Sequence, residues 1–573
     1  MVNIEVNHHK VQAQKGETIL TALKREGIRV PTLCHLEGLT PTGACRVCAV
    51  EVEGMPALIP SCSYPVSEGM KIHTHSARAL EARRTIIELL LANHPDDCLY
   101  CVGNGNCDLQ HLAEELGVRN RLFKGKRSTG KLDVSSPSLV RDPDKCILCG
   151  KCVRVCEEIQ GVAAIDFVRR GSQAIVGTAF DTGLNLSSCV NCGQCIIVCP
   201  TGALSEQSHI GRVMNALRDP EKMVVVQHAP SISVTIAEEF GLKPGTDADG
   251  HLVTALRRLG FYRVFDTSFT ADLTIMEEAS ELVHRIQTGG VLPMMTSCSP
   301  GWIKFVEEFY PDYIPNLSTC KSPQQMLGAV AKSYWAQQEG VDPSKVFCVS
   351  IMPCVAKKFE MGRPEHRRDG LPDIDAVLTT RELARMIKMA GLSLADLPAG
   401  LPDSPLGERS TAGKIFGATG GVMEAAVRTA HYLITGKDMT ELKIQPLRGT
   451  KGVKEATVEV AGIQVGVAVA SGLGNARNLL EQVKAGRKDL HFIEIMTCPG
   501  GCVAGGGQPL GTDLEKVKLR MKALYTIDRE EAVRTSHANK DVAKLYAEFL
   551  GQPLGHKSHE LLHTHYAKRE VLI

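Results

Sequence analysis

Cysteines at short, repeated gaps are the residues of this chain whose type and spacing could do chemistry. The sequence has 573 residues and 21 cysteines, fifteen of which precede residue 200. Disulfides are typical of small secreted domains, whereas two-residue gaps between cysteines are typical of thiolate ligands to zinc or iron–sulfur clusters. The pattern therefore predicts a protein with several sulfur-ligated metal sites.

Two cysteine runs share the spacing C-x2-C-x2-C-x3-C, which matches bacterial two-cluster ferredoxins. The runs contain Cys146, Cys149, Cys152 and Cys156, and then Cys189, Cys192, Cys195 and Cys199. In that fold the fourth cysteine of each run binds the other run's [4Fe–4S] cluster. We therefore expect Cys199 to complete the first site and Cys156 to complete the second.

Two further ligand sets precede these runs. One comprises Cys34, Cys45, Cys48 and Cys62, and the other comprises His94, Cys98, Cys101 and Cys107. Four thiolates suit a [2Fe–2S] cluster, with structural zinc as the alternative. The Cys3His set suits either zinc or a [4Fe–4S] cluster, and the neighbouring motifs favour iron. A neutral imidazole ligand would raise that cluster's reduction potential above those of its neighbours. Four such sites in series would carry electrons between the surface and a buried reaction centre.

The segments around these cysteines predict a multidomain α/β chain. Residues 1–78 alternate with period two around one amphipathic helix, which predicts a small sheet crossed by a helix. With its four cysteines this segment resembles a β-grasp [2Fe–2S] ferredoxin-like domain. Residues 79–123 read as a small helical Cys3His domain, and residues 124–208 as a polar linker followed by the two-[4Fe–4S] ferredoxin domain. Residues 209–573 alternate apolar runs with helical segments, which predicts a two-lobed α/β catalytic domain.

Three apolar runs of the last region end in cysteine, at Cys298, Cys354 and Cys498. Open α/β sheets bind ligands beyond the carboxyl ends of their strands, so these thiols should converge on one cleft. Cys502 follows Cys498 across Pro499, Gly500 and Gly501, and the glycines would let the backbone approach a bulky cofactor closely.

Three motifs make a family resemblance specific. TSCSPGW at residues 296–302, MPCVAKKFE at 352–360 and EIMTCPGGCVAGGGQP at 494–509 resemble the signature motifs of iron-only ([FeFe]) hydrogenases. The likeness spans the chain, including the accessory cluster sites in order, and indicates the large, multi-cluster type. It implies reversible oxidation of H2 at a six-iron H-cluster. That cofactor is a [4Fe–4S] cubane joined through one cysteine to a diiron site with CO, cyanide and a dithiolate amine.

The resemblance also implies roles for residues around this cofactor. Cys354, Cys498 and Cys502 would bind the cubane, with Cys502 as the bridge, and Lys357 would donate to a cyanide. The remaining pocket residues would be Ala229, Pro230, Ser231, Gln324, Met352 and Met496. Ordinary core packing is the alternative for both methionines.

One departure from the family pattern concerns the fourth cubane ligand. The usual TSCCPGW motif has a cysteine where this chain has Ser299, and the chain has Cys320 where we expect a small residue. We expect Cys320 to replace the missing ligand. The alternatives are a Ser299 alkoxide, which is harder than a thiolate, or a displaced Cys298.

A proton path is the last implied feature. Cys298 matches the residue that passes protons to the bridging amine, and Glu278, Glu281, Ser318 and Arg285 match the family's relay positions. Glu278 and Glu281 are three residues apart and so share one helix face. The spacing of the two glutamates alone would favour a solvated acidic helix face. The match of all five residues to the family's positions favours a proton relay instead.

The rest of the sequence limits partners and location. A net charge of +1 argues against nucleic-acid binding, and apolar windows are too short for a membrane span. The N-terminus lacks a secretory signal, so we expect a cytoplasmic enzyme. Two glycine-rich segments, FGATGGVMEAA and GLGNAR, do not complete a dinucleotide-binding motif. Coupling to NAD(P) would therefore need partner subunits that bind flavin or NAD(P). Ferredoxin would be another partner. The TSCSPGW variant and the domain order resemble the catalytic subunits of multimeric NAD(P)-linked, sometimes electron-bifurcating, hydrogenases. The competing hypotheses are a complex I-like electron-transfer subunit, an iron–sulfur assembly protein and a hydrogen sensor.

Overall fold

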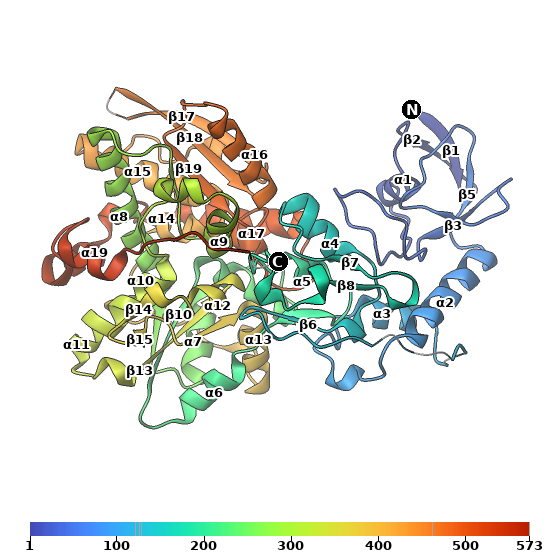
Figure 1. The fold of residues 1–573 in the computed structure, drawn as a ribbon, viewed down its shortest axis with the longest axis horizontal. Coiled ribbons are helices and arrows are strands. Elements are labelled where there is room, and N and C mark those ends of the chain that lie inside the picture. The colour runs from blue at the N-terminus through green and yellow to red at the C-terminus, as the bar shows by residue number, and fades with distance from the viewer. Residues whose placement is uncertain (121, 125–126, 128, 461, 572–573) are drawn as a thin grey trace.

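The computed structural model describes residues 1–571 except 121, 125–126, 128 and 461. Figure 1 shows the chain running from an N-terminal sheet at one end, through the paired cysteine runs in the middle, to a large two-lobed region at the other end. The last described segment returns toward the middle of the molecule, where the Arg569 amide donates to the Glu307 carbonyl at 2.9 Å. None of the described helices is both long and apolar enough to cross a bilayer.

The N-terminal sheet has five strands in the order β2-β1-β5-β3-β4. Its elements are β1 (Val2–Val6), β2 (His9–Ala13), α1 (Ile19–Arg25), β3 (Ala49–Val52), β4 (Ile59–Pro60) and β5 (Lys71–His73). β1 pairs parallel with β5 and antiparallel with β2. The predicted alternation holds because Val2, Ile4 and Val6 point into the core that α1 covers.

The middle of the molecule contains short elements around the cysteines. They are α2 (Ala77–Ala92), α3 (Asp108–Glu115), β6 (Leu139–Arg141), α4 (Lys151–Arg154), β7 (Asp166–Val168), β8 (Ile175–Gly177), α5 (Gln194–Val198) and β9 (Leu204–Glu206). β6 pairs with β9, and β7 pairs with β8. The pair β6–β9 joins the two ends of the ferredoxin-like segment, so both cysteine runs lie within one unit.

The two lobes of the catalytic region are each built on a four-stranded sheet (Figure 1). The first has the order β11-β10-β13-β16 and is entirely parallel. The second has the order β12-β19-β18-β17, in which β17 and β18 form an antiparallel hairpin. The strands are β10 (Met223–His228), β11 (Arg263–Asp266), β12 (Met294–Met295), β13 (Val346–Met352), β16 (Ala376–Thr379), β17 (Val453–Val460), β18 (Ile463–Ser471) and β19 (Phe492–Met496). A small pair, β14 (Arg367–Arg368) and β15 (Leu371–Pro372), lies outside both sheets. The apolar runs identified in the sequence form buried strands, and the hairpin was not expected.

Helices cover both sheets. They are α6 (Ile210–Arg218), α7 (Asp249–Arg258), α8 (Thr267–Thr288), α9 (Pro300–Phe309), α10 (Pro323–Val330), α11 (Ala336–Glu339), α12 (Ala356–Glu360), α13 (Thr380–Met389), α14 (Thr411–Lys414), α15 (Gly421–Thr435), α16 (Leu473–Lys484), α17 (Leu514–Glu530), α18 (Lys540–Leu545) and α19 (His556–Leu562). α8 contacts α10 of one lobe and α15 of the other, so this helix joins the lobes. Asp266 caps its first turn, and Gly289 ends it at φ 72°.

Candidate active site

The paired cysteine runs form two cavities, each lined by three cysteines of one run and the last cysteine of the other. Cys146, Cys149 and Cys152 line one cavity with Cys199, and Cys189, Cys192 and Cys195 line the other with Cys156. This is the arrangement that the spacing predicts. Left-handed glycines, Gly150 and Gly193, precede α4 and α5 and turn the chain between the cysteines.

The two upstream sets also gather. In the N-terminal domain the Cys34 thiol hydrogen-bonds with those of Cys45 and Cys62, and Cys48 hydrogen-bonds with Cys62. These contacts lower the pKa of Cys34 and lower that of Cys48 to about 7. His94, Cys98 and Cys107 line one hollow, and the nearby Cys101 helps to raise the pKa of Cys107 after burial.

Cys298, Cys354 and Cys502 meet in a cavity between the lobes, with about 530 Å³ of empty space. Its predicted lining residues are all present: Ala229, Pro230, Ser231, Cys298, Gln324, Met352, Cys354, Lys357, Met496 and Cys502. The Cys498 thiol lies behind this wall, close enough to Cys354, Cys192 and Cys502 that their charges help to raise its pKa after burial. Cys498 therefore lies between the cavity and the nearest accessory site.

One of the glycines beside Cys498 lies against a neighbouring segment of the chain. Gly501 has φ 91°, and a Cβ atom there would lie 2.6 Å from the backbone nitrogen of Thr419 and 3.2 Å from the carbonyl oxygen of Gly417. The missing side chain lets this loop pack against a segment that lines the cavity at Gly417.

A buried carboxylate that the sequence reasoning missed holds two of the cavity residues. Glu360 accepts hydrogen bonds from Lys357 Nζ at 3.0 and 2.9 Å, from Gln324 Nε2 at 3.0 Å and from the Ser322 hydroxyl at 2.9 Å. Lys357 Nζ also donates to the Cys298 carbonyl at 3.1 Å. The signal was present in the sequence, since Glu360 ends MPCVAKKFE one helical turn after Lys357.

The relay residues lie in the predicted order on one side of the cavity. Glu278 is close to the Cys298 thiol and helps to raise its pKa, after burial. Burial and the nearby Glu281 raise the pKa of Glu278 to about 8. The Ser318 hydroxyl hydrogen-bonds to Glu278 and donates to Glu281 Oε2 at 2.9 Å, and Arg285 donates to Glu281 Oε1 at 2.6 Å. Glu278 and Glu281 are 1% and 7% exposed, so this is not a solvated acidic face.

The structure does not bring Cys320 to the cubane ligands, which corrects that expectation. Its Sγ lies 3.9 Å from Glu281 Oε2, and burial followed by Glu281 and Glu278 raises its pKa. Cys320 is not among the described residues that line the cavity. The Ser299 hydroxyl instead lies 2.7 Å from that of Thr497, the residue before Cys498. Cys320 therefore borders the predicted proton relay, while Ser299 lies near Cys498, one of the predicted cubane ligands.

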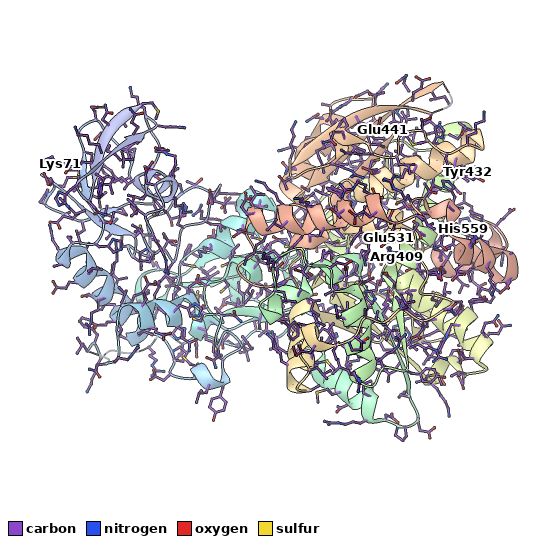
Figure 2. The ribbon with its side chains drawn as sticks, turned by 180° about the vertical axis from the view of Figure 1, so that it is seen from behind. Lys71, Arg409, Tyr432, Glu441, Glu531 and His559 are labelled. Atoms are coloured by element: carbon purple, nitrogen blue, oxygen red, sulfur yellow. The ribbon has the colours of Figure 1, made fainter. Side chains whose placement is uncertain are left out.

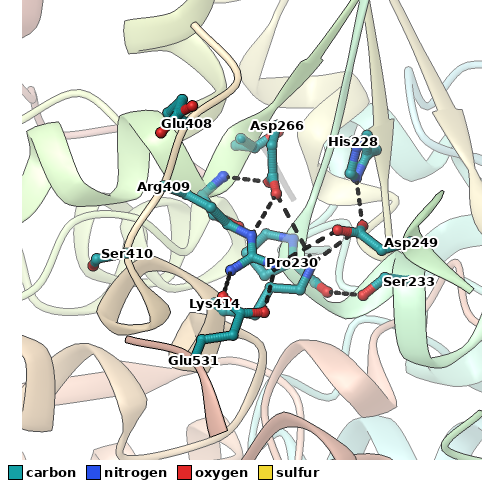
Figure 3. Close-up of polar contacts among 12 residues, drawn as sticks. His228, Pro230, Ser233, Asp249, Asp266, Glu408, Arg409, Ser410, Lys414 and Glu531 are labelled. Atoms are coloured by element: carbon teal, nitrogen blue, oxygen red, sulfur yellow. Dashed lines mark hydrogen bonds and ion pairs between the residues drawn. The ribbon is translucent and has the colours of Figure 1, made fainter. Parts of the chain in front are cut away.

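An ionic network lies behind the cavity segment that contains Ala229, Pro230 and Ser231. Figure 3 shows His228 pointing toward Asp249, which is paired with Lys414 at 3.1 Å. Arg409 bonds to Asp266 at 3.0 Å and to Glu531 at 2.5 Å. Seen from behind, Arg409 and Glu531 lie close together in the catalytic region (Figure 2). The network ties β10, α7, β11, α14 and the end of α17 together at the cavity's back wall.

The residues present fit an iron–sulfur cofactor in the cavity. Three thiols converge there with one buried ammonium, and Gln324 Oε1 is buried with no hydrogen-bond partner among the described residues. Burial raises the pKa of Cys502 to about 12, so metal must displace a proton to bind it. Bound iron would supply positive charge to the buried thiolates, whose burial without such a partner costs free energy.

Family comparisons match every part of the chain that carries these sites. Residues 222–506 match "Iron only hydrogenase large subunit, C-terminal domain", and residues 514–569 match "Iron hydrogenase small subunit". Residues 1–77 match a 2Fe-2S iron-sulfur cluster binding domain, 83–121 an NADH-ubiquinone oxidoreductase-G iron-sulfur binding region and 145–203 a 4Fe-4S dicluster domain.

Full-length relatives and solved structures agree with these matches. The chain is 47% identical to "NADP-reducing hydrogenase subunit HndD" of Solidesulfovibrio fructosivorans, over 100% of both chains. It is 42% identical to "Iron hydrogenase 1" of Clostridium pasteurianum, over 99% of this chain and 100% of the relative. A variant of apo [FeFe]-hydrogenase HydA1 from Chlamydomonas reinhardtii matches with a TM-score of 0.57 and 44% identity, over 63% of this chain and 99% of that chain. The chain belongs to the iron-only hydrogenase family.

Proposed function

We propose that this enzyme interconverts H2 with protons and electrons in the cavity between its catalytic lobes. The observation that carries the proposal is the position of that cavity. Cys354, Cys498 and Cys502 connect it to the Cys192 site on one side, and Cys298 connects it to the buried relay on the other. One reaction centre is thus linked to separate routes for electrons and protons.

The chain's residues hold and surround the six-iron cofactor of the family. Cys354, Cys498 and Cys502 would be its thiolate ligands, and the buried Lys357 and Gln324 would offer it polar groups. Met352, Met496 and Phe416 keep water from the cavity. When bound, the cofactor supplies the redox-active iron at which H2 is cleaved or formed, with CO, cyanide and a dithiolate amine as its other ligands.

Protons leave and enter through the relay. The Cys298 thiol holds a proton at the cavity wall, and Glu278, with a pKa of about 8, exchanges protons with it near neutral pH. Ser318 joins the two carboxyl groups, and Arg285 orients Glu281 at the outer end. A group whose pKa lies near the working pH can both accept and donate a proton, so protons can move in either direction.

We assign Ser299 as the remaining side chain at the cubane. Its hydroxyl is adjacent to Thr497 and therefore to Cys498, whereas Cys320 contacts Glu281. An alkoxide is a harder ligand than a thiolate and would hold iron less firmly.

Electrons move along one [2Fe–2S] and three [4Fe–4S] accessory clusters, held by the four ligand sets described above. We propose partner subunits that bind NAD(P) and a flavin, because the relative HndD is named as a subunit of an NADP-reducing hydrogenase. Ferredoxin is proposed as a second electron partner.

Infrared spectroscopy on the matured protein tests the function, together with H2-dependent reduction of methyl viologen. We expect CO and cyanide bands and hydrogenase activity that disappears in Cys502→Ser. Accessory clusters without these bands and without activity would instead indicate an electron-transfer subunit. An iron–sulfur assembly protein would give the same negative result. That alternative is considered because the chain is 34% identical to "Cytosolic iron-sulfur assembly component 3" of Mus musculus over 67% of its length.

A further inference from the structure

A thiol, an imidazole and a carboxylate from three distant segments meet at the outer end of the relay. Cys320, Glu281 and His563, here called the Cys320 cluster, are buried, and their ligand atoms all lie within 4.8 Å of one another. Glu281 belongs to α8, Cys320 to the segment before α10 and His563 to the end of α19. Sulfur, nitrogen and oxygen donors of these three types make up tetrahedral zinc sites in proteins.

The backbone holds the Cys320 cluster together. Cys320 and His563 form an antiparallel β-bridge. Beside this bridge, the Lys321 amide donates to the Leu562 carbonyl at 2.7 Å. Glu281 Oε2 lies 3.9 Å from Cys320 Sγ. Neighbouring ligand atoms of a tetrahedral zinc site lie about 3.3–3.8 Å apart, so shifts of about 1 Å would complete the site.

The imidazole of the Cys320 cluster is oriented through both of its nitrogens. His563 Nε2 lies 3.1 Å from Glu277 Oε2, and Nδ1 lies 2.7 Å from the Thr319 hydroxyl. An ion that takes one nitrogen leaves the other contact in place, and such a contact fixes the ring of a metal-binding histidine. The ring of His559, an exposed residue (Figure 2), lies 4.3 Å from that of His563. A second imidazole therefore connects the cluster with the surface.

The charges around the Cys320 cluster suit a divalent cation. With zinc bound, the Cys320 thiolate and the carboxylates of Glu277 and Glu281 carry three negative charges, which Zn²⁺ and Arg285 balance. Arg285 bonds to Glu281 Oε1 at 2.6 Å, whereas Oε2 is the oxygen beside Cys320. The neighbouring Glu278 has a pKa of about 8 and is mostly protonated at neutral pH. The buried group is then neutral, and paired charges are the ones that proteins bury.

A second group of possible ligands, His228, Asp249 and Asp266, already has cations beside it. Lys414 pairs with Asp249 at 3.1 Å, and Arg409 pairs with Asp266 at 3.0 Å. An added divalent ion would have to displace both of these side chains. The group at His228 is therefore a structural ion network, and the Cys320 cluster is the stronger metal site.

We propose that the Cys320 cluster binds Zn²⁺ through Cys320 Sγ, a Glu281 oxygen and one nitrogen of His563, with water as the fourth ligand. Binding releases the Cys320 thiol proton to solvent, because the thiolate is the form that binds metal. It also takes Glu281 out of the relay, since a carboxylate bound to a divalent cation no longer accepts a proton. Zinc then inhibits turnover in both directions. This inhibition rests on the proposed hydrogenase function, whereas the metal site itself does not.

The site is tested on the full-length holoenzyme with its iron–sulfur clusters loaded. The protein is incubated with a small excess of ZnCl2 and separated from free metal by gel filtration. We expect one Zn²⁺ per chain, and X-ray absorption at the zinc edge should show one sulfur at about 2.3 Å with nitrogen and oxygen at about 2.0 Å. Iron content and the EPR signals of the clusters should not change. A zinc ion with three or four sulfur ligands would lie in a vacant cluster site and would contradict the assignment.

Two variants test the ligands, Cys320→Ala and His563→Gln. Each is compared with its own zinc-free rate of H2-dependent methyl viologen reduction. The zinc concentration for half inhibition should rise about tenfold or more in both variants, and Cys320→Ala should lose the zinc–sulfur signal. The matched controls are Cys348→Ala, at a buried cysteine of β13, and His565→Gln, at an exposed histidine. Both controls should be inhibited at the wild-type zinc concentration.

Three results would overturn parts of the proposal. Equal inhibition of the wild type and of both ligand variants would place the inhibitory zinc elsewhere. One bound zinc with full activity would refute the block of the relay at Glu281. Absence of viologen reduction in the zinc-free wild type would instead refute the hydrogenase function, and X-ray absorption would still report on the metal site.

Discussion

At the scale of single residues, we expect the protonation of Glu278 to set the pH dependence of the reaction. Its pKa is raised to about 8, so it holds a proton below that pH and loses it above. H2 evolution needs a proton donor and should fall as pH rises through about 8, while H2 oxidation needs an acceptor and should rise over the same range. Initial rates in both directions from pH 6 to 10 measure this. In Glu278→Gln the shared transition near pH 8 should vanish together with most of the activity.

Glu281 joins the inner relay to Arg285. Glu281→Gln keeps the size of the side chain and removes its ability to accept a proton, so turnover should fall about 10²-fold or more with iron content unchanged. The exposed Glu560→Gln is the control, and viologen-linked rates with iron assays provide the comparison. Full activity in Glu281→Gln would contradict the proposed path.

The identity of the fourth cubane side chain is also decided by single residues. Because Ser299 lies beside Thr497 and Cys320 lies beside Glu281, Ser299→Ala should lower cubane iron and Ser299→Cys should retain or increase it. Cys320→Ser should leave iron unchanged. Iron per chain and EPR of the cubane measure both effects, and iron loss confined to Cys320→Ser would restore the ligand exchange expected from the sequence.

At the scale of elements, α14 and β11 hold the back wall of the cavity through buried charges. Lys414 has a fully buried side chain and lies between Asp249 and Asp266 (Figure 3). Lys414→Met leaves those carboxylates short of a cation, which is expected to destabilise the protein by about 3–5 kcal/mol. Thermal unfolding should therefore begin at a lower temperature. The exposed pair of Lys518 and Glu515 gives the control Lys518→Met, whose effect should be within about 1 kcal/mol.

At the scale of the whole molecule, electron transfer depends on the close contact of the ferredoxin-like unit with the catalytic region. A Cβ atom on Gly506 would overlap the Cys192 carbonyl oxygen, and one on Gly193 would overlap the side chain of Val355. Gly506→Ala should force these segments apart and slow electron transfer from the cavity to the accessory sites. H2-dependent dye reduction should therefore fall further than H2/D2O exchange, which needs no electron to leave. Gly211→Ala is the control, because a Cβ atom there meets nothing within 4 Å. An equal loss of both activities would contradict this reasoning.

The sequence by itself predicted which cysteines gather in groups and the mixed α/β content of the catalytic region. Cysteine spacing predicted that Cys199 and Cys156 would cross between the two runs. The strand-end positions predicted that Cys298 and Cys354 would share a cleft, and Cys498 lies just behind its wall. Such predictions succeed because ligand geometry and strand direction limit where nearby residues can lie. Only the tertiary structure decided the place of Cys320, the anchoring role of Glu360 and the ionic network at His228. These depend on contacts between residues distant in sequence, since Cys320 meets Glu281 across 39 positions and Lys414 meets Asp249 across 165. Spacing along the chain contains no information about such pairs, because the packing of whole helices and sheets sets their distance.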